Sequence, residues 1–252
     1  MKKLTILWLT IATLFVATDK LSAQYYQTDY SSDTQFHTGF DIEHKVGERW
    51  GWNWGEELYF GNTMSEFQKI YSRLIVNYYL SPKVRISPMV LHIANRAAGS
   101  YTMIYDLNVG YTERYDKLSV TLRGGTRLQD VIYPTTEDPQ MVKTEPQFQL
   151  RAHLAVGYRA LDWLEPFANI ETFLMLNPAT DQDLSVGYYL SRVRSNVGVK
   201  FHVDKKSTIS LYWRYDQTQN KFISYEGRYV PFGIISKRNA VNFVGVFYHY
   251  RF

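Results

Sequence analysis

The sequence feature that most limits how this chain can fold is a strict alternation of apolar and polar residues, sustained for about twelve positions at a time. In residues 147–159, every even position from Phe148 to Tyr158 is apolar or aromatic, whereas the odd positions include Gln149 and Arg151. A β-strand points successive side chains to opposite faces, so such a segment has one apolar face and one polar face. The same alternation recurs in two further segments, 117–128 and 192–203.

The alternating segments predict an all-β chain with unusually long strands. A globular strand has about five or six residues, whereas a tilted strand that crosses a bilayer needs about 9 to 11. We expect eleven strands, at residues 36–46, 50–60, 67–80, 84–94, 101–114, 117–128, 147–159, 163–175, 185–203, 207–216 and 239–252.

The number of strands needs one further assumption. Bacterial single-chain membrane barrels have an even number of strands, so we expect a twelfth, short strand near Gln24 to Tyr30. Ten strands is the alternative, if the Trp-rich segment 50–60 or the segment around Pro88 is irregular. Proline cannot donate a ladder hydrogen bond, so we also expect a bulge or a strand end close to Pro88 and to Pro166.

Short and long connections alternate along the chain. The short ones are centred on residues 47–49, 81–83, 115–117, 160–162 and 204–206, and the longer ones cover 61–66, 95–100, 129–146, 176–184 and 217–238. Outer-membrane barrels have short periplasmic turns at one end and longer extracellular loops at the other. The pattern therefore predicts a transmembrane, antiparallel, up-and-down β-barrel with both termini in the periplasm. It disfavours a soluble sandwich or a propeller.

The aromatic residues, 16% of the chain, support the membrane reading over a soluble barrel. One group falls near the predicted short turns: Trp50, Tyr78, Tyr111, Tyr115, Tyr158, Trp163, Tyr248, Tyr250 and Phe252. A second group falls toward the long loops: Phe60, Phe67, Tyr101, Tyr105, Phe173, Trp213 and Tyr215. Two aromatic bands around a Val/Leu/Ala zone are what the two headgroup regions of a bilayer select.

The first 23 residues have the form of a secretory signal peptide. Two lysines precede an apolar run from Leu4 to Ala17, which is shorter than the roughly 20 residues of a membrane-spanning helix. We expect cleavage near Ala23-Gln24, which leaves one barrel domain at 24–252 with 25 basic and 23 acidic residues. A nearly neutral exported chain gives no support for nucleic-acid binding. The absence of cysteine excludes disulfides, thiolate metal sites and a cysteine nucleophile.

The C-terminal strand carries a separate signal. Apolar or aromatic residues occupy every second position up to the end of the chain, namely Val246, Tyr248, Tyr250 and Phe252. This pattern resembles the signal by which the barrel-assembly machinery recognises outer-membrane barrels. This C-terminal pattern, the alternation of short and long connections, and strands such as 212–216 (YWRYD) together carry a family resemblance. The chain resembles an uncharacterised family of Gram-negative, Bacteroidetes-type outer-membrane barrels, domain of unknown function 2490. The resemblance implies an outer-membrane location with lipid and the assembly machinery as partners, and it brings no catalytic site.

The polar phase of the strands would face the lumen and is rich in charge. It contains seven acids (Asp41, Glu43, Glu57, Asp106, Glu165, Glu171 and Asp216) and fifteen bases (Lys45, Lys69, Arg73, Arg85, Arg114, Lys117, Arg123, Arg127, Arg151, Arg159, Arg192, Arg194, Lys200, Arg214 and Arg251). Twelve strands enclose a lumen on the order of 10 Å wide once side chains are placed. Such charges either interlock and close the lumen or leave a narrow cationic pore.

Three functional readings follow from this interior. The first is a structural or accessory outer-membrane barrel with a largely plugged lumen and an unknown complex partner. The second is a small diffusion channel for anionic or polar solutes, because a ring of like charge sets ion preference. The third, which the sequence supports least, is a lipid-modifying enzyme: no histidine has a serine two residues on, and no G-x-S-x-G is present.

The sequence offers no other recognisable chemistry. Asn177, Asp181 and Asp183 place oxygen ligands in one loop, but their spacing is far from that of an EF-hand, and a solvated acidic loop is the simpler interpretation. No G-x-G-x-x-G or phosphate-binding loop is present. We therefore expect no catalytic residue, no metal and no cofactor.

Overall fold

A computed structural model describes residues 26–61, 66–96, 99–133, 142–143, 146–178, 186–226 and 230–252. Every regular element is a β-strand: β1 (Tyr26–Val46), β2 (Trp50–Gly61), β3 (Glu66–Tyr79), β4 (Val84–Asn95), β5 (Ser100–Tyr115), β6 (Leu118–Tyr133), β7 (Val142–Lys143), β8 (Gln147–Tyr158), β9 (Leu164–Met175), β10 (Tyr189–His202), β11 (Ser207–Glu226) and β12 (Val230–Arg251). No helix among these residues is long and apolar enough to cross a membrane. The expected signal peptide lies outside the described residues.

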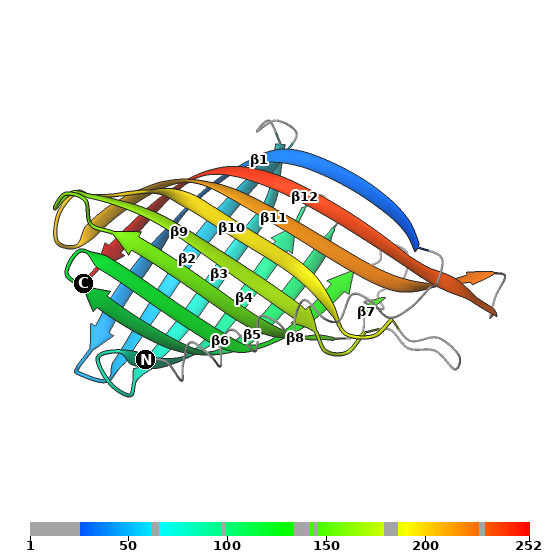
Figure 1. Cartoon of the computed structure of the whole chain (residues 1–252), viewed down its shortest axis with the longest axis horizontal. Coiled ribbons are helices and arrows are strands. Elements are labelled where there is room, and N and C mark those ends of the chain that lie inside the picture. The colour runs from blue at the N-terminus through cyan, green and yellow to red at the C-terminus, as the bar shows by residue number, and fades with distance from the viewer. Residues whose placement is uncertain are drawn as a thin grey trace.

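The strands form a closed barrel, with each long strand paired to its two neighbours (Figure 1). Within the described residues eleven strands make the ring, while the two-residue β7 pairs only with β6. Neighbours run antiparallel except β1 and β12, which close the barrel as a parallel pair from Tyr26↔Ile234 to Glu43↔Arg251. The all-β barrel predicted from the alternation is confirmed.

The expected twelfth strand was wrong. Residues 26–30 do not form a strand of their own but continue β1, which is 21 residues long. An odd number of strands forces one parallel pair in an otherwise antiparallel ring, and here that pair is β1 with β12. The start of β1 therefore lies at the opposite end of the barrel from Phe252, so the expectation that both termini share one end does not hold for the described residues.

The five predicted short turns all lie at the end that carries Phe252, whose backbone N–H donates to the carbonyl of Glu43 at 2.9 Å. Residues 217–226 and 230–238, expected to belong to a loop, instead lengthen β11 and β12, and these paired strands project beyond the others (Figure 1). Register shifts occur beside Ser191, at Tyr59/Phe60 and at Ser224/Tyr225.

The two prolines act as expected in part. Pro166 lies two residues from the start of β9, which satisfies the expectation of a strand end. Around Pro88 the ladder between β3 and β4 is interrupted between Ile75↔Met89 and Tyr78↔Ile86, without a change of register. The hydroxyl of Ser87 donates to the amide oxygen of Asn77 at 2.7 Å, so a side-chain bond bridges the gap.

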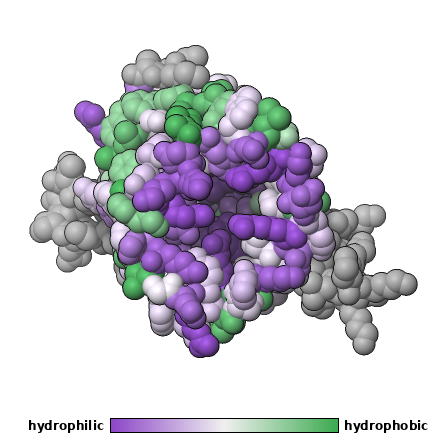
Figure 2. Space-filling view, turned by 90° about the vertical axis from the view of Figure 1, so that its left-hand side faces the viewer, coloured by the Kyte–Doolittle hydropathy of each residue, from purple (hydrophilic) through white to green (hydrophobic). Residues whose placement is uncertain are grey.

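The barrel has an inverted distribution of side chains. Its outer face exposes large apolar residues, among them Leu107 (53%), Val109 (51%), Val197 (51%) and Trp213 (45%), whereas charged residues such as Asp106 and Glu171 are buried. Figure 2 shows the short-turn end, where hydrophilic residues line a central hollow. The prediction for Phe173 was wrong. We expected this residue in the outer aromatic band, but it is fully buried, because it lies two residues from Glu171 on β9 and therefore points to the same, inward side.

Candidate functional site

A chain of ion pairs follows the inner face from β5 to β11. We call it the Asp106 network; it consists of Asp106, Arg123, Arg127, Arg151, Glu171, Arg192, Arg194 and Asp216. Arg127 on β6 holds Asp106 on β5 with two hydrogen bonds of 2.8 and 2.9 Å. Arg151 on β8 reaches over β6 to the same carboxylate and also binds Glu171. One guanidinium thus joins carboxylates of two strands that are not neighbours.

The network continues through Arg194 on β10. Its Nη1 lies 3.3 Å from Glu171 and its Nε lies 3.1 Å from Asp216 on β11, which Arg192 also binds. Arg123 lies 3.7 Å from Glu171. Five guanidinium groups therefore share three carboxylates, so the network carries an excess of positive charge.

Phe173 fills the space between the guanidinium groups of this network. The ring centroid lies 4.8 Å from the guanidinium carbon of Arg127, 5.2 Å from that of Arg151 and 5.7 Å from that of Arg192. A desolvated cation over an aromatic face is favourable by about 2 kcal/mol. The ring therefore spaces and stabilises cations that would otherwise repel one another.

A second cluster lies on the other side of the interior. We call it the His37 network; it consists of His37, Asp41, Glu57, Tyr59, Arg73 and Tyr212. Glu57 on β2 is its centre: one carboxylate oxygen accepts from Arg73 at 3.0 Å, and the other lies 3.0 Å from Nε2 of His37 and 2.9 Å from the hydroxyl of Tyr59. Arg73 also binds Asp41.

Strand register explains how Tyr212 reaches His37. Both residues pair with Gly245 of β12, one from each side. Gly245 has no side chain, and an added Cβ would collide with the Tyr212 ring. The ring therefore passes over β12, and its hydroxyl hydrogen-bonds Nδ1 of His37, whose ring stacks on Tyr59 at 4.3 Å.

Arg214 extends from β11 over β12 and β1 to β2. Its Nη1 donates to the hydroxyl of Tyr59 at 3.1 Å, and its Nε donates to the amide oxygen of Asn196 at 2.6 Å. Asn196 in turn donates to the amide oxygen of Asn169 at 2.5 Å. Among the described residues, no carboxylate lies within ion-pair distance of Arg214.

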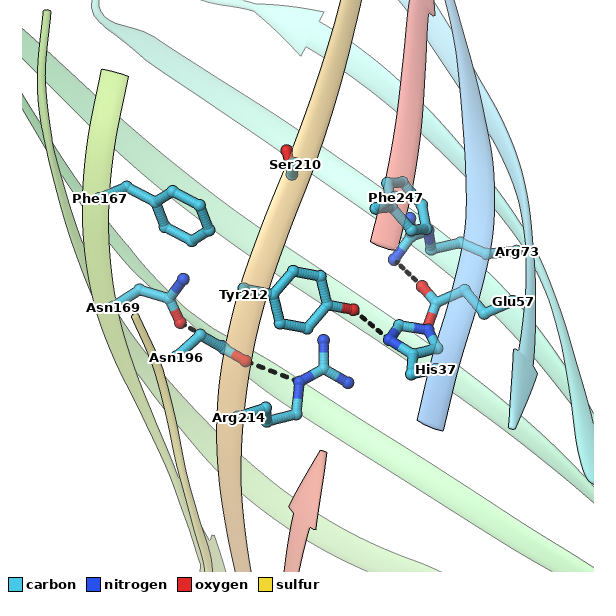
Figure 3. Close-up of a pocket in the computed structure, with 10 residues that line it drawn as sticks. All are labelled: His37, Glu57, Arg73, Phe167, Asn169, Asn196, Ser210, Tyr212, Arg214 and Phe247. Carbon is cyan, nitrogen blue, oxygen red and sulfur yellow. Dashed lines mark hydrogen bonds and ion pairs between the residues drawn. The ribbon is translucent and has the colours of Figure 1, made fainter. Parts of the chain in front are cut away.

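A cavity of about 190 Å³ lies between these side chains (Figure 3). Its lining combines charged residues with two amides, the hydroxyls of a serine and a tyrosine, and three aromatic rings besides the imidazole: His37, Glu57, Arg73, Phe167, Asn169, Asn196, Ser210, Tyr212, Arg214 and Phe247. The strands β1, β2, β3, β9, β10, β11 and β12 all contribute. The cavity is therefore a product of barrel closure rather than of any one hairpin.

Smaller ion pairs lie near the short-turn end. Lys200 binds Glu165 at 2.5 Å, and His202 lies 3.2 Å from the other oxygen of that carboxylate. Glu43 on β1 binds Arg251 on β12 at 2.8 Å, across the parallel seam. We call these pairs, which lie on β1, β9, β10 and β12 close to the short turns, the rim.

The ten lumen-facing candidates chosen from the sequence all take part in these contacts. Arg123, Arg127, Arg151, Glu171 and Arg194 meet in the Asp106 network, Glu57 and Arg73 in the His37 network, and Arg214 beside the latter, while Glu43 and Lys200 belong to the rim. Of the four residues of the C-terminal pattern, Val246 and Tyr248 on β12 are exposed and Tyr250 on the same strand is half-buried, while Phe252, which follows β12, is exposed.

The sequence interpretation missed His37, Tyr212, Asn169 and Ser210 as site residues. A search for a serine near each histidine overlooked a tyrosine 175 positions away. The alternation along the strands could have predicted that His37 and Tyr212 face inward. Their contact, however, depends on the parallel pairing of β1 with β12. Groups of three or more metal-ligating side chains are absent from the described residues, and Asp181 and Asp183 lie outside them.

Comparison with known protein families supplies an independent identification. A family model, described as a protein of unknown function (DUF2490), matches residues 34–223, which is most of the chain. The chain belongs to the DUF2490 family. The match runs from β1 to β11 and so includes the Asp106 network and most of the cavity lining. A search of curated proteins finds no match.

Proposed function

We propose that this DUF2490 protein is an outer-membrane β-barrel whose lumen is closed by its own charged side chains, and that it has a structural or accessory role in that membrane. The outer face supports the membrane location. Exposed Leu, Val, Ile and Trp side chains would be unfavourable in water but match hydrocarbon. The apolar alternation that ends at Phe252 and the signal-like first 23 residues agree with export to that membrane.

The observation that carries the closed lumen is the burial of charge in the interior. Asp106 is 4% exposed, Arg127 5% and Glu171 4%. In a water-filled pore, inward charges would be bathed by solvent. Here other side chains cover them, from strands as far apart in the ring as β5 and β8.

The energetics favour a network that stays closed. A buried charge without its partner costs several kcal/mol, so breaking a buried pair is strongly unfavourable. Asp106 and Glu171 each serve more than one guanidinium. Opening a passage would separate several such pairs at once.

Planar bilayer recording tests the closed lumen. The folded barrel, verified by its heat-dependent mobility in detergent gels, is expected to give no steady unitary conductance. The double variant Arg151→Ala, Arg194→Ala removes two side chains that meet at Glu171, and we expect it to conduct once folded. Steady conductance of the unaltered barrel would overturn the proposal.

An anion-selective diffusion channel is the second candidate, favoured by the hydrophilic hollow in Figure 2 and by fifteen bases against seven acids in the inward phase. If the barrel conducts, this candidate predicts anion preference. Replacing Arg123 and Arg127 with Glu should then reverse the preference.

The location and partners are tested in cells. Fractionation should place the protein with the outer membrane, and mass spectrometry should find a chain that begins near Gln24. Recovery in the soluble periplasmic fraction would refute the location. Crosslinking before detergent extraction should identify any outer-membrane complex to which the barrel belongs.

A further inference from the structure

We propose that the cavity beside Arg214 is a binding site for a small organic carboxylate, an acid group on an apolar body. This inference goes beyond the proposed closed lumen and needs only the folded barrel, because inward-facing side chains of seven strands line the cavity. Its cation, its hydrogen-bond donors and its apolar walls each point to one part of such a ligand.

Arg214 supplies the charge. It lines the cavity, and its own partners are the neutral oxygens of Tyr59 and Asn196. Five arginines of the Asp106 network and Arg73 all pair with carboxylates, whereas Arg214 has none among the described residues. A guanidinium within a barrel, without a counter-charge, favours an anion in the adjoining space.

The only carboxylate lining the described cavity is that of Glu57, and both of its oxygens already have partners. Arg73 holds one oxygen, while His37 and Tyr59 hold the other. Arg73 pairs with Glu57 and also with Asp41, which does not line the cavity. The lining itself therefore holds two guanidinium groups against one carboxylate. An incoming anion is attracted to the guanidinium that has no carboxylate partner in the described part of the chain, that of Arg214.

Neutral donors lie beside this cation. Asn169 accepts from Asn196 through its oxygen, which leaves its Nδ2 group without a protein acceptor among the described residues. Ser210 likewise has no side-chain bond there, and its hydroxyl lines the same cavity. Figure 3 shows Asn169, Ser210 and Arg214 around one space. Carboxylate oxygens accept several hydrogen bonds at once.

The remaining walls are apolar. Phe167 and Phe247 contribute rings, as does the face of Tyr212, over which Arg214 lies at 5.2 Å. A cavity of about 150 Å³ accepts benzene, so about 190 Å³ accommodates a benzene-sized body with one carboxylate. Inorganic phosphate could pair with Arg214, but it has no apolar surface to pack against the aromatic rings.

Isothermal titration calorimetry on the folded barrel in detergent micelles tests the assignment, with benzoate, its neutral isostere benzamide and inorganic phosphate as probes. Benzoate should bind, and the other two at least tenfold more weakly. Arg214→Gln should weaken benzoate binding at least tenfold, since a hydrogen bond to a charged group contributes that much. Arg49→Gln, the same change at an exposed turn residue, should bind as the unaltered barrel does.

Ser210→Phe provides a variant that keeps every charge. It should fill the cavity and abolish benzoate binding while the barrel keeps its heat-dependent gel mobility. The proposal is overturned if the folded barrel does not bind benzoate, if Arg214→Gln or Ser210→Phe binds it unchanged, or if phosphate binds as tightly as benzoate.

Discussion

Arg127 and Asp106 form a two-bond ion pair inside the barrel, with nitrogen–oxygen distances of 2.8 and 2.9 Å and almost no exposure of either side chain. Asp106 also receives Arg151. Asp106→Asn would leave Arg127 without its charge partner and would leave Arg151 with Glu171 alone, so we expect it to lower the free energy of unfolding by about 3–5 kcal/mol. Urea unfolding followed by tryptophan fluorescence measures the loss.

Asp116→Asn is the matched control for that variant. Asp116 lies in the β5–β6 turn with a positive φ of 49°, a conformation that asparagine also adopts. Its unfolding free energy should stay within about 0.5 kcal/mol of the unaltered value. Equal stability of the two variants would mean that the buried pair has no net role.

The stabilising role of the Phe173 ring between the guanidinium groups of the Asp106 network can be tested by substitution. Phe173→Leu removes the ring that contacts three guanidinium groups and leaves a cavity, with an expected cost of about 2–4 kcal/mol. Phe148→Leu makes the same change at an outward, 39% exposed position on β8 and should cost less than about 1 kcal/mol. Thermal unfolding in the same micelles compares them; a larger loss at Phe148 would contradict the inward placement of Phe173.

The parallel seam can be tested by crosslinking, because the chain has no cysteine of its own. Thr38 pairs with Val246, so Thr38→Cys with Val246→Cys should crosslink efficiently in the folded barrel. Thr38→Cys with Tyr250→Cys is four residues out of register, about 13 Å away along the strand, and should not. Preferential crosslinking of the second pair would refute the register.

Asp204 predicts a pH dependence in the β10–β11 turn. Its carboxylate accepts the backbone N–H groups of Lys206 at 2.6 Å and Ser207 at 2.8 Å, which lowers the pKa of Asp204 below its ordinary value of 3.8. The stabilisation is therefore complete above that ordinary value and is lost as pH falls through the lowered pKa. Asp204→Ala should be less stable than the unaltered chain at pH 7, and the difference should shrink in strong acid. A difference that does not change with pH would contradict this.

The strands could be predicted from the sequence because the alternation that marks each strand, and the turn residues that end it, are adjacent in the chain. Alternation with period two fixed both faces of β8, and the five short turns marked strand ends closely. The strand number could not be fixed in this way. The even count rested on what other barrels do, whereas the continuation of Tyr26–Tyr30 into β1 depends on pairing with β12, far along the chain.

The candidate site was predictable only in part for the same reason. The alternation of apolar and polar residues along each strand indicated that Arg214 and Glu57 face inward. It could not show that Arg214 lacks a carboxylate partner among the described residues while the carboxylate of Glu57 has three partners. Those facts depend on which strands meet across the seam. Phe173 shows the opposite error, since its aromatic character was given more weight than its phase.

If the protein is an outer-membrane barrel as proposed, hydrocarbon surrounds its apolar outer face while polar groups fill its interior. Leu154 is exposed on the outer face of β8, and Ala155 is its inward neighbour. Spin labels at Leu154→Cys and Ala155→Cys, in the barrel reconstituted into lipid vesicles, measure collision with oxygen, which concentrates in hydrocarbon, and with a water-soluble nickel chelate. We predict high oxygen and low nickel accessibility at position 154, with low oxygen accessibility at position 155. If the nickel chelate collided with the label at position 154 as often as with a spin label free in water, that result would contradict the membrane location.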